Sequence, residues 1–249
     1  MTDHPLSRRR FVQSLAWSGL SISALVGSPV FSLPVTEVDP VEELALRKAA
    51  SHIMSFGSPY ASDNWRYSPH MHQQLKSNIQ QMSQGKIYVD ILDSGKAGVG
   101  VELMAAVSRG TLSAALVSAS NLTPVAPELD ILNIPFWSAD NQRYLNLVTS
   151  SVWDELIVQK IRKHKRLDVL FHYVVGPRTL ASTNLSGKVL KTPGDIKGEI
   201  VRVPASRILL DFYEMAGAVP RKVAWKRTAY AAREGAIQAL DPSIVGLFN

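Results

Sequence analysis

Apolar and polar positions follow two different periods along the chain. Four apolar residues spaced three or four apart predict one buried helix face: Met71, Leu75, Ile79 and Met82. Pro69 lies at the expected first turn of this helix, and Gly85 lies where a left-handed glycine would end it. Directly after it, alternate positions become apolar, which predicts a strand over residues 86–93.

The same reasoning predicts the other elements. Helices are expected over residues 42–50, 102–108, 139–148, 151–165, 206–216 and 226–234. Strands are expected over residues 53–56, 167–175, 178–183, 199–203 and 237–240, with a further strand ending at Val117. Because strands and helices alternate at short intervals, the pattern indicates parallel α/β units.

The break at Gly176-Pro177 is where we expect the chain to cross between two lobes. The predicted first α/β lobe covers residues 35–170 and the second covers 171–249. Ligands of open parallel sheets bind at the carboxyl ends of the strands. This rule directs attention to the loops over 58–64 and 118–121.

The N-terminal segment has the pattern of an export signal. Arg8-Arg9-Arg10-Phe11 precedes a short apolar stretch over 15–26 that serines interrupt. Paired arginines followed by phenylalanine are typical of twin-arginine signals, and the apolar stretch is too short to be a permanent anchor. We therefore expect residues 1–34 to be a twin-arginine signal peptide and the protein to be periplasmic.

Composition removes several classes of function. The chain of 249 residues has no cysteine, which excludes disulfides, thiolate metal sites and cysteine nucleophiles. Its net charge of +6 is small, and the dense basic run over 160–166 reads as the end of a helix, so nucleic acid is not an expected partner.

No motif of a catalytic or cofactor site occurs in the sequence. Nucleophile elbows, phosphate loops, dinucleotide fingerprints and zinc-protease motifs are all absent. His70 and His72 fall on different sides of their helix and are poorly placed to share a metal ion. The sequence therefore predicts neither catalytic residues, nor a bound metal, nor a cofactor.

Several local motifs together resemble the solute-binding subunits of tripartite ATP-independent periplasmic (TRAP) transporters, the DctP family. They are Phe56-Gly57-Ser58-Pro59-Tyr60, Val117-Ser118-Ala119-Ser120-Asn121-Leu122, Pro127-Glu128-Leu129, Ile134-Pro135-Phe136, Pro177-Arg178-Thr179-Leu180, Thr192-Pro193-Gly194-Asp195-Ile196-Lys197-Gly198 and Val201-Arg202-Val203-Pro204. The stretch from Thr192 to Pro204 is the most specific, and the resemblance covers about residues 50 to 240.

The resemblance implies a two-lobe α/β fold of the periplasmic-binding-protein kind, type II-like, that closes on its ligand. Such a protein captures a small organic acid and passes it to the membrane subunits of a TRAP permease. It is not an enzyme, and we expect it to be a monomer.

The resemblance also implies roles for six residues. Arg202 is expected to grip the ligand carboxylate, since a guanidinium matches a carboxylate with two parallel hydrogen bonds. Arg178 corresponds to a second arginine near the ligand, with a purely structural role as the alternative. Trp225 corresponds to an aromatic residue that covers the ligand, with packing in the core as the alternative. Three first-lobe positions are expected to vary with the substrate: Ser118, Asn121 and Asn64.

The chain departs from the family pattern in three places. Arg227 replaces an acidic residue, and its side chain could bind a second acidic group or face solvent. Asp241 matches the asparagine expected before Pro242 only if one residue is skipped. Family members also continue beyond position 249, so we expect the chain to be C-terminally truncated, without the strands that return to the first lobe.

Two alternatives to transport remain open. The chain could be a periplasmic ligand-binding module that serves a sensor kinase, or a nonfunctional truncated fragment. A third possibility, an enzyme exported by the twin-arginine route with a bound cofactor, is disfavoured because the sequence has no cofactor motif.

Overall fold

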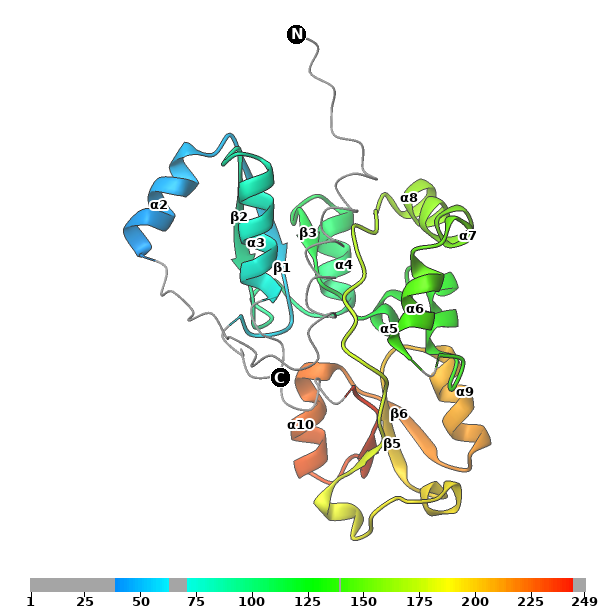
Figure 1. The fold of residues 1–249 in the computed structure, drawn as a ribbon. Helices are drawn as coiled ribbons and strands as arrows, with labels where there is room; N and C mark the ends of the chain where they lie inside the picture. The colour runs from blue at the N-terminus through cyan, green and yellow to red at the C-terminus, as the bar shows by residue number, and fades with distance from the viewer. Residues whose placement is uncertain (1–38, 63–70, 139, 244–249) are drawn as a thin grey trace, which may run out of the picture. The chain divides into compact units, whose positions relative to one another are not determined.

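The computed structural model describes residues 39–62, 71–138 and 140–243 (Figure 1). These residues form two compact units. Of the described residues, the smaller unit contains 39–53 and 75–88, and the larger unit contains 54–62, 71–74, 89–138 and 140–243. The predicted signal peptide over 1–34 lies outside the described residues. The two predicted lobes remain a prediction.

Two helices contribute to the smaller unit. Helix α2 (Pro40–Ala49) begins where Asp39 accepts a hydrogen bond of 2.9 Å from the backbone N–H of Val41. Helix α3 (Met71–Met82) buries Leu75 and Ile79 in this unit, as its apolar spacing predicted. Beside them, a cluster of hydrogen bonds links the side chains of Lys76, Glu43 and Tyr88.

The first sheet has three strands in the order β2-β1-β3. They are β1 (His52–Gly57), β2 (Ile87–Leu92) and β3 (Ala114–Ala115), with helix α4 (Val101–Ser108) before the last. Strands β1 and β3 run parallel, with Phe56 opposite Ala114. Parallel pairing agrees with the alternation of strands and helices in the sequence.

Short helices fill the next part of the larger unit. They are α5 (Ala119–Leu122), a 3-10 helix (Pro127–Asn133), α6 (Asn141–Val148), α7 (Ser151–Trp153), a π segment (Asp154–Val158) and α8 (Gln159–Lys165). They enclose an apolar core that includes Leu129, Val148, Trp153 and Ile161. The predicted loop over 118–121 was therefore wrong in part, because α5 begins at Ala119.

Two other predictions in this region need correction. The predicted helix over 151–165 is one helical stretch, but its middle is a π segment. The predicted strand over 167–175 belongs to neither sheet. Its apolar residues have strand character, but a strand also needs a partner for its ladder of hydrogen bonds. Leu167 contributes to the apolar core instead.

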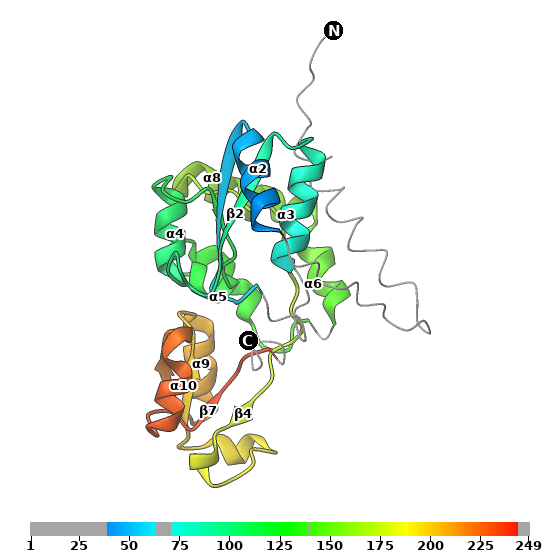
Figure 2. The ribbon, with the colours of Figure 1, turned by 90° about the vertical axis from the view of Figure 1, so that its left-hand side faces the viewer.

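The second sheet has four strands in the order β4-β7-β5-β6. They are β4 (Ala181–Ser182), β5 (Ile200–Val203), β6 (Val219–Lys222) and β7 (Ala239–Leu240). Strand β5 pairs in parallel with β6 and β7, whereas β4 pairs antiparallel with β7. Helix α9 (Arg207–Met215) packs against β5 and β6, and α10 (Trp225–Arg233) precedes β7 (Figure 2).

The half-buried imidazole of His172, whose Nε2 is fully buried, predicts an acid-sensitive fold. It packs edge-on against the rings of Tyr144 and Trp153, its Nδ1 lies 3.3 Å from the Tyr144 hydroxyl, and its Nε2 has no hydrogen-bond partner among the described residues. Burial lowers the pKa of His172 from 6.5 to about 4. As the pH falls, His172 of the unfolded chain therefore binds a proton near pH 6.5, whereas His172 of the folded chain binds it only near pH 4.

Stability is expected to fall by roughly 3 kcal/mol as the pH decreases from about 6.5 to about 4. Burial also lowers the pKa of His72, which adds to the loss with the same sign. Urea unfolding across this range measures the slope, and His172→Phe should reduce it. The exposed His52 provides the control variant, His52→Gln. An unchanged slope in His172→Phe would contradict the assignment.

Candidate functional site

Arg202 lies in the middle of β5, where its neighbours fix its direction. Val201 and Val203 are fully buried on one face of the strand, so the alternation of side chains directs Arg202 to the other face. The residue is only 4% exposed. Its Nε donates a hydrogen bond of 2.9 Å to the carbonyl oxygen of Val223. Its guanidinium carbon lies 5.3 Å from the centre of the Trp225 ring.

This arrangement fixes one edge of the Arg202 guanidinium and leaves the other available. Among the described residues, its Nη1 and Nη2 have no hydrogen-bond partner. Burial lowers the pKa of Arg202 to about 10, and the nearby Asp241 carboxylate opposes this shift. The group is therefore still a cation at neutral pH.

Arg178 lies beside the same sheet but is already engaged. It forms an isolated antiparallel bridge with Ser243, next to β7. Its Nη1 donates to the Asp241 carbonyl oxygen at 2.7 Å and to Asp241 Oδ1 at 3.2 Å. Its Nη2 donates to the hydroxyl oxygen of Ser120 at 2.6 Å.

Asp241 is the acidic group that bonds to Arg178 and acts on Arg202 through its charge alone. It follows Leu240, which lies opposite Arg202 in the parallel pairing of β5 and β7. The residue is 2% exposed, and burial raises the pKa of its carboxyl group. Arg178, Arg202 and the Tyr213 hydroxyl oppose that rise. Two guanidinium groups beside one buried carboxyl group favour the carboxylate.

Tyr60 adds a hydroxyl group near the two arginines. It follows β1 in the loop over 58–64 that the carboxyl-end rule selected. Burial raises the pKa of Tyr60, and the charges of Arg178 and Arg202 oppose the rise. Its backbone N–H donates a 3.1 Å hydrogen bond to the hydroxyl oxygen of Ser58. The loop thus supplies a polar side chain to the surroundings of both guanidinium groups.

A buried aspartate anchors the helix that follows Arg202. Asp130 Oδ2 accepts hydrogen bonds from the backbone N–H groups of Arg207 at 2.8 Å and Ile208 at 3.1 Å. Its Oδ1 accepts from the Ser206 hydroxyl at 2.5 Å and from Asn133 Nδ2 at 2.9 Å. Three of these donors, from Ser206, Arg207 and Ile208, belong to the N-terminus of α9 or to its cap, where a carboxylate is favoured.

The same network reaches Arg178. The Ser120 hydroxyl accepts from Arg178 and donates to Asn133 Oδ1 at 2.6 Å. In parallel, the Thr123 hydroxyl donates to the carbonyl oxygen of Ala205 at 2.8 Å. Residues 120–133 therefore hold both Arg178 and the loop that follows Arg202.

The structure places the other predicted residues as follows. Trp225 faces Arg202, as described above. Ser118 caps α5 through its backbone carbonyl, which accepts from the N–H of Asn121 at 2.8 Å, and both residues are half-buried. Asn64 lies outside the described residues. Arg227 is exposed, and its guanidinium carbon lies 5.9 Å from the centre of the Tyr230 ring.

Sequence reasoning missed Asp130, Ser120 and Tyr60 as parts of this site. Tyr60 follows directly after a predicted strand, and ligands of open parallel sheets bind at the carboxyl ends of the strands, so its position in the sequence could have indicated it. Asp130 lies between apolar residues, and its exposure of 8% and its four partners depend on contacts that a sequence does not display.

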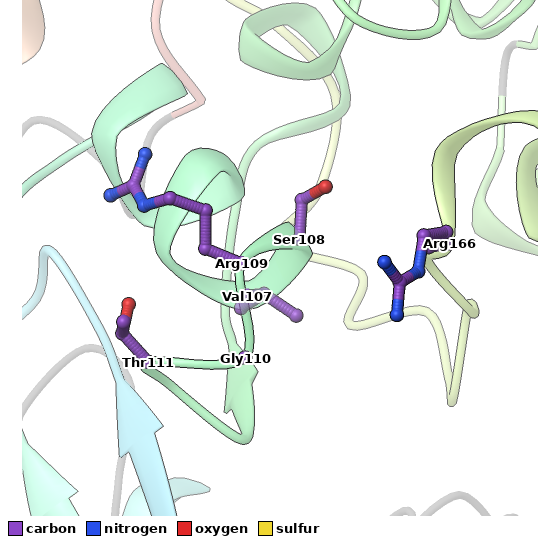
Figure 3. Close-up of a pocket in the computed structure, with 6 residues that line it drawn as sticks. All are labelled: Val107, Ser108, Arg109, Gly110, Thr111 and Arg166. Atoms are coloured by element: carbon purple, nitrogen blue, oxygen red, sulfur yellow. The ribbon is translucent and has the colours of Figure 1, made fainter.

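A separate hollow lies elsewhere in the larger unit. It has a volume of about 680 Å³ and is lined by Val107, Ser108, Arg109, Gly110, Thr111 and Arg166. Figure 3 shows Arg166 across from the end of α4, with the side chain of Arg109 directed away from it. The two guanidinium groups do not converge, and the hollow lies at the carbonyl end of a helix, which disfavours anions.

Two kinds of feature are absent from the part of the chain that the structure describes. Nowhere in that part of the chain do three or more histidine, cysteine, aspartate or glutamate side chains gather as metal ligands would. None of the helices described there is both long and apolar enough to cross a membrane.

Comparison with known proteins identifies relatives of the chain. The C4-dicarboxylate-binding protein DctB of Bacillus subtilis is 23% identical over 69% of this chain and 47% of its own length. The 2,3-diketo-L-gulonate-binding periplasmic protein YiaO of Escherichia coli is 22% identical over 57% of this chain and 42% of its own. The chain spans about half the length of the curated relatives it matches.

The chain is also similar to solved structures of solute-binding proteins. A TRAP periplasmic solute-binding protein of Haemophilus influenzae with bound L-gulonate matches with a TM-score of 0.67 and 22% identity, covering 76% of this chain and 60% of that one. The sugar acid binding protein DctPAm of Advenella mimigardefordensis, in complex with galactonate, matches with a TM-score of 0.71 and 18% identity, covering 78% and 61%. The predicted α/β fold of a two-lobe periplasmic binding protein is confirmed for the covered part.

The model of the bacterial extracellular solute-binding protein family 7, also called DctP, matches residues 61–244. This family consists of solute-binding proteins and is not a family of enzymes. Because the match extends over most of the sequence and agrees with the fold, the chain belongs to the bacterial extracellular solute-binding proteins of family 7.

Proposed function

We propose that the protein is a periplasmic receptor that captures a small organic acid and delivers it to a TRAP-type membrane permease. The observation that carries this proposal is the buried guanidinium group of Arg202, with one edge fixed and its terminal nitrogens unpartnered among the described residues. Burying a cation is costly unless it gains a partner. A ligand carboxylate would be such a partner.

The relatives support an acid as the ligand. Their structures contain L-gulonate, galactonate and succinate. In this proposal Arg202 grips the carboxylate and Trp225 covers it, while Arg178 lies beside it. Ser118, Asn121 and Asn64 contact the remainder of the ligand.

The proposal also includes an export route and an oligomeric state. Residues 1–34 direct export by the twin-arginine route, and the protein acts as a monomer in the periplasm. Its lobes, over 35–170 and 171–249, close on the ligand. The membrane subunits of the permease are its partners.

A thermal shift assay tests the proposed function. Purified protein is heated with gluconate, galactonate, galacturonate, succinate or malate, and with glucose and galactose as neutral controls. An acid at a hundredfold excess over its Kd should stabilise the fold by about 2.7 kcal/mol. In a chain of this size that corresponds to a rise in Tm of about 5 to 10 °C. Absence of any shift across the acids, or equal shifts with the neutral sugars, would contradict the proposal.

A further inference from the structure

The two arginines of the site differ in how many of their hydrogen-bond donors are available to a ligand. Arg178 donates from Nη1 to the Asp241 side chain and backbone, and the Asp241 side chain is only 3% exposed. Its Nη2 is occupied by Ser120. The Arg178–Asp241 pair therefore contributes no net charge, and both terminal nitrogens of Arg178 are engaged.

Other basic groups of α10 and the preceding strand are directed elsewhere. The Lys226 ammonium lies 3.6 Å from a carboxylate oxygen of Glu102. Arg227 is exposed beside Tyr230, and Arg221 donates to the carbonyl oxygen of Ala236 at 2.6 Å. In the described part of the chain, Arg202 is thus the cation of the site that no carboxylate contacts directly.

We propose that Asp241 is a specificity-determining residue, which neutralises Arg178 so that the site prefers monocarboxylates, such as hydroxy or sugar monoacids, to dicarboxylates. This inference rests on the proposed function. A monocarboxylate balances the single charge of Arg202, and its hydroxyl groups suit polar side chains such as those of Tyr60 and Asn121. The second carboxylate of a dianion would meet the occupied Arg178 and the negative Asp241.

Physical costs make the second carboxylate unfavourable. To bind Arg178 it must displace Asp241, which would leave a buried carboxylate without its direct partner. If it does not displace Asp241, it lies as a like charge in a site of low dielectric. Replacing Asp241 with asparagine removes both costs and keeps an oxygen that accepts from Arg178.

Matched pairs of ligands test the inference by isothermal titration calorimetry at pH 7.5. The pairs are gluconate with glucarate, galactonate with galactarate, and succinamate with succinate. In the wild-type protein the monoanion of a pair that binds should bind at least about tenfold more tightly. In Asp241→Asn that ratio should fall by about tenfold or more. Asp211→Asn is the control, because Asp211 pairs with Arg207 on the exposed side of α9, and it should leave the ratio unchanged.

The outcomes separate this inference from the proposed function. If the wild-type protein binds the dianion as tightly as the monoanion or more tightly, the inference is wrong although the acid-binding function stands. If Asp241→Asn folds and keeps the wild-type ratio, the role of Asp241 is wrong. If no acid of any pair binds to the wild-type protein, the proposed function itself fails. The wild-type ratio decides the ligand class even if the variant does not fold.

Discussion

Replacing Arg202 with alanine should weaken the binding of every carboxylate ligand by about two to four orders of magnitude. In the proposed binding mode the variant would lose two charged hydrogen bonds to the ligand, each worth roughly 1.5 to 3 kcal/mol. It also removes the cation that Trp225 covers at 5.3 Å. Calorimetric titration with the acid that gives the largest thermal shift measures the effect.

A lysine at position 202 distinguishes charge from geometry. Arg202→Lys keeps the positive charge but loses the planar fork and the Nε that bonds to Val223. It should bind about ten to a hundred times more weakly than the wild type, between the wild type and the alanine variant. If Arg202→Ala folds and binds its acid as the wild type does, the carboxylate lies elsewhere and the site assignment is wrong.

Replacing Asp130 with alanine should give a large loss of stability, about 3 to 5 kcal/mol. The Asp130 carboxylate accepts hydrogen bonds from Arg207, Ile208, Ser206 and Asn133. The residue is buried, so these donors would have no ready access to water as a replacement. Chemical denaturation of the variant and the wild type at pH 7.5 measures the difference.

Asp140 supplies a matched control for this prediction. Its carboxylate also caps a helix, accepting a 2.7 Å hydrogen bond from the backbone N–H of Arg143, but this contact is exposed. Asp140→Ala should therefore cost only about 1 kcal/mol. Equal losses in the two variants would show that the buried network around Asp130 adds nothing to an ordinary helix cap.

Regular periodicity made much of the fold predictable. Leu75 and Ile79 are buried on one face of α3, and Gly85 follows it with a φ of 75°. Helix α9 likewise ends before Gly217, whose φ is 83°. In both cases local spacing and a residue that tolerates the left-handed region were sufficient.

Elements that depend on distant partners were harder to predict. Strand β6 was not among the predicted strands; it contains Pro220, a residue that is unfavourable inside a sheet, yet it pairs in parallel with β5. Residues 167–175 show the opposite error. They have the composition of a strand and were predicted as one, but no other strand of the described residues pairs with them. Tertiary pairing decided both cases.

The candidate site also contains some contacts that the sequence indicates and others that only the folded chain shows. Arg202 and Trp225 lie together, and their roles toward a ligand stay a prediction. The family motifs did not indicate that Asp241 holds Arg178. That contact joins residues 63 positions apart in the sequence. Asp130 and Ser206, 76 positions apart, likewise meet only in the folded chain.

Strand β6 also has a consequence for the protein in concentrated solution. It is the last strand of the second sheet as described, and three of its four residues are exposed. An exposed edge strand has unpaired backbone N–H and C=O groups, so a strand of another molecule can pair with it and begin aggregation. Pro220 offers no N–H for such an addition, and the positive charges of Arg221 and Lys222 would repel an identical chain. Pro220 and the two charges thus protect the edge of the sheet against self-association.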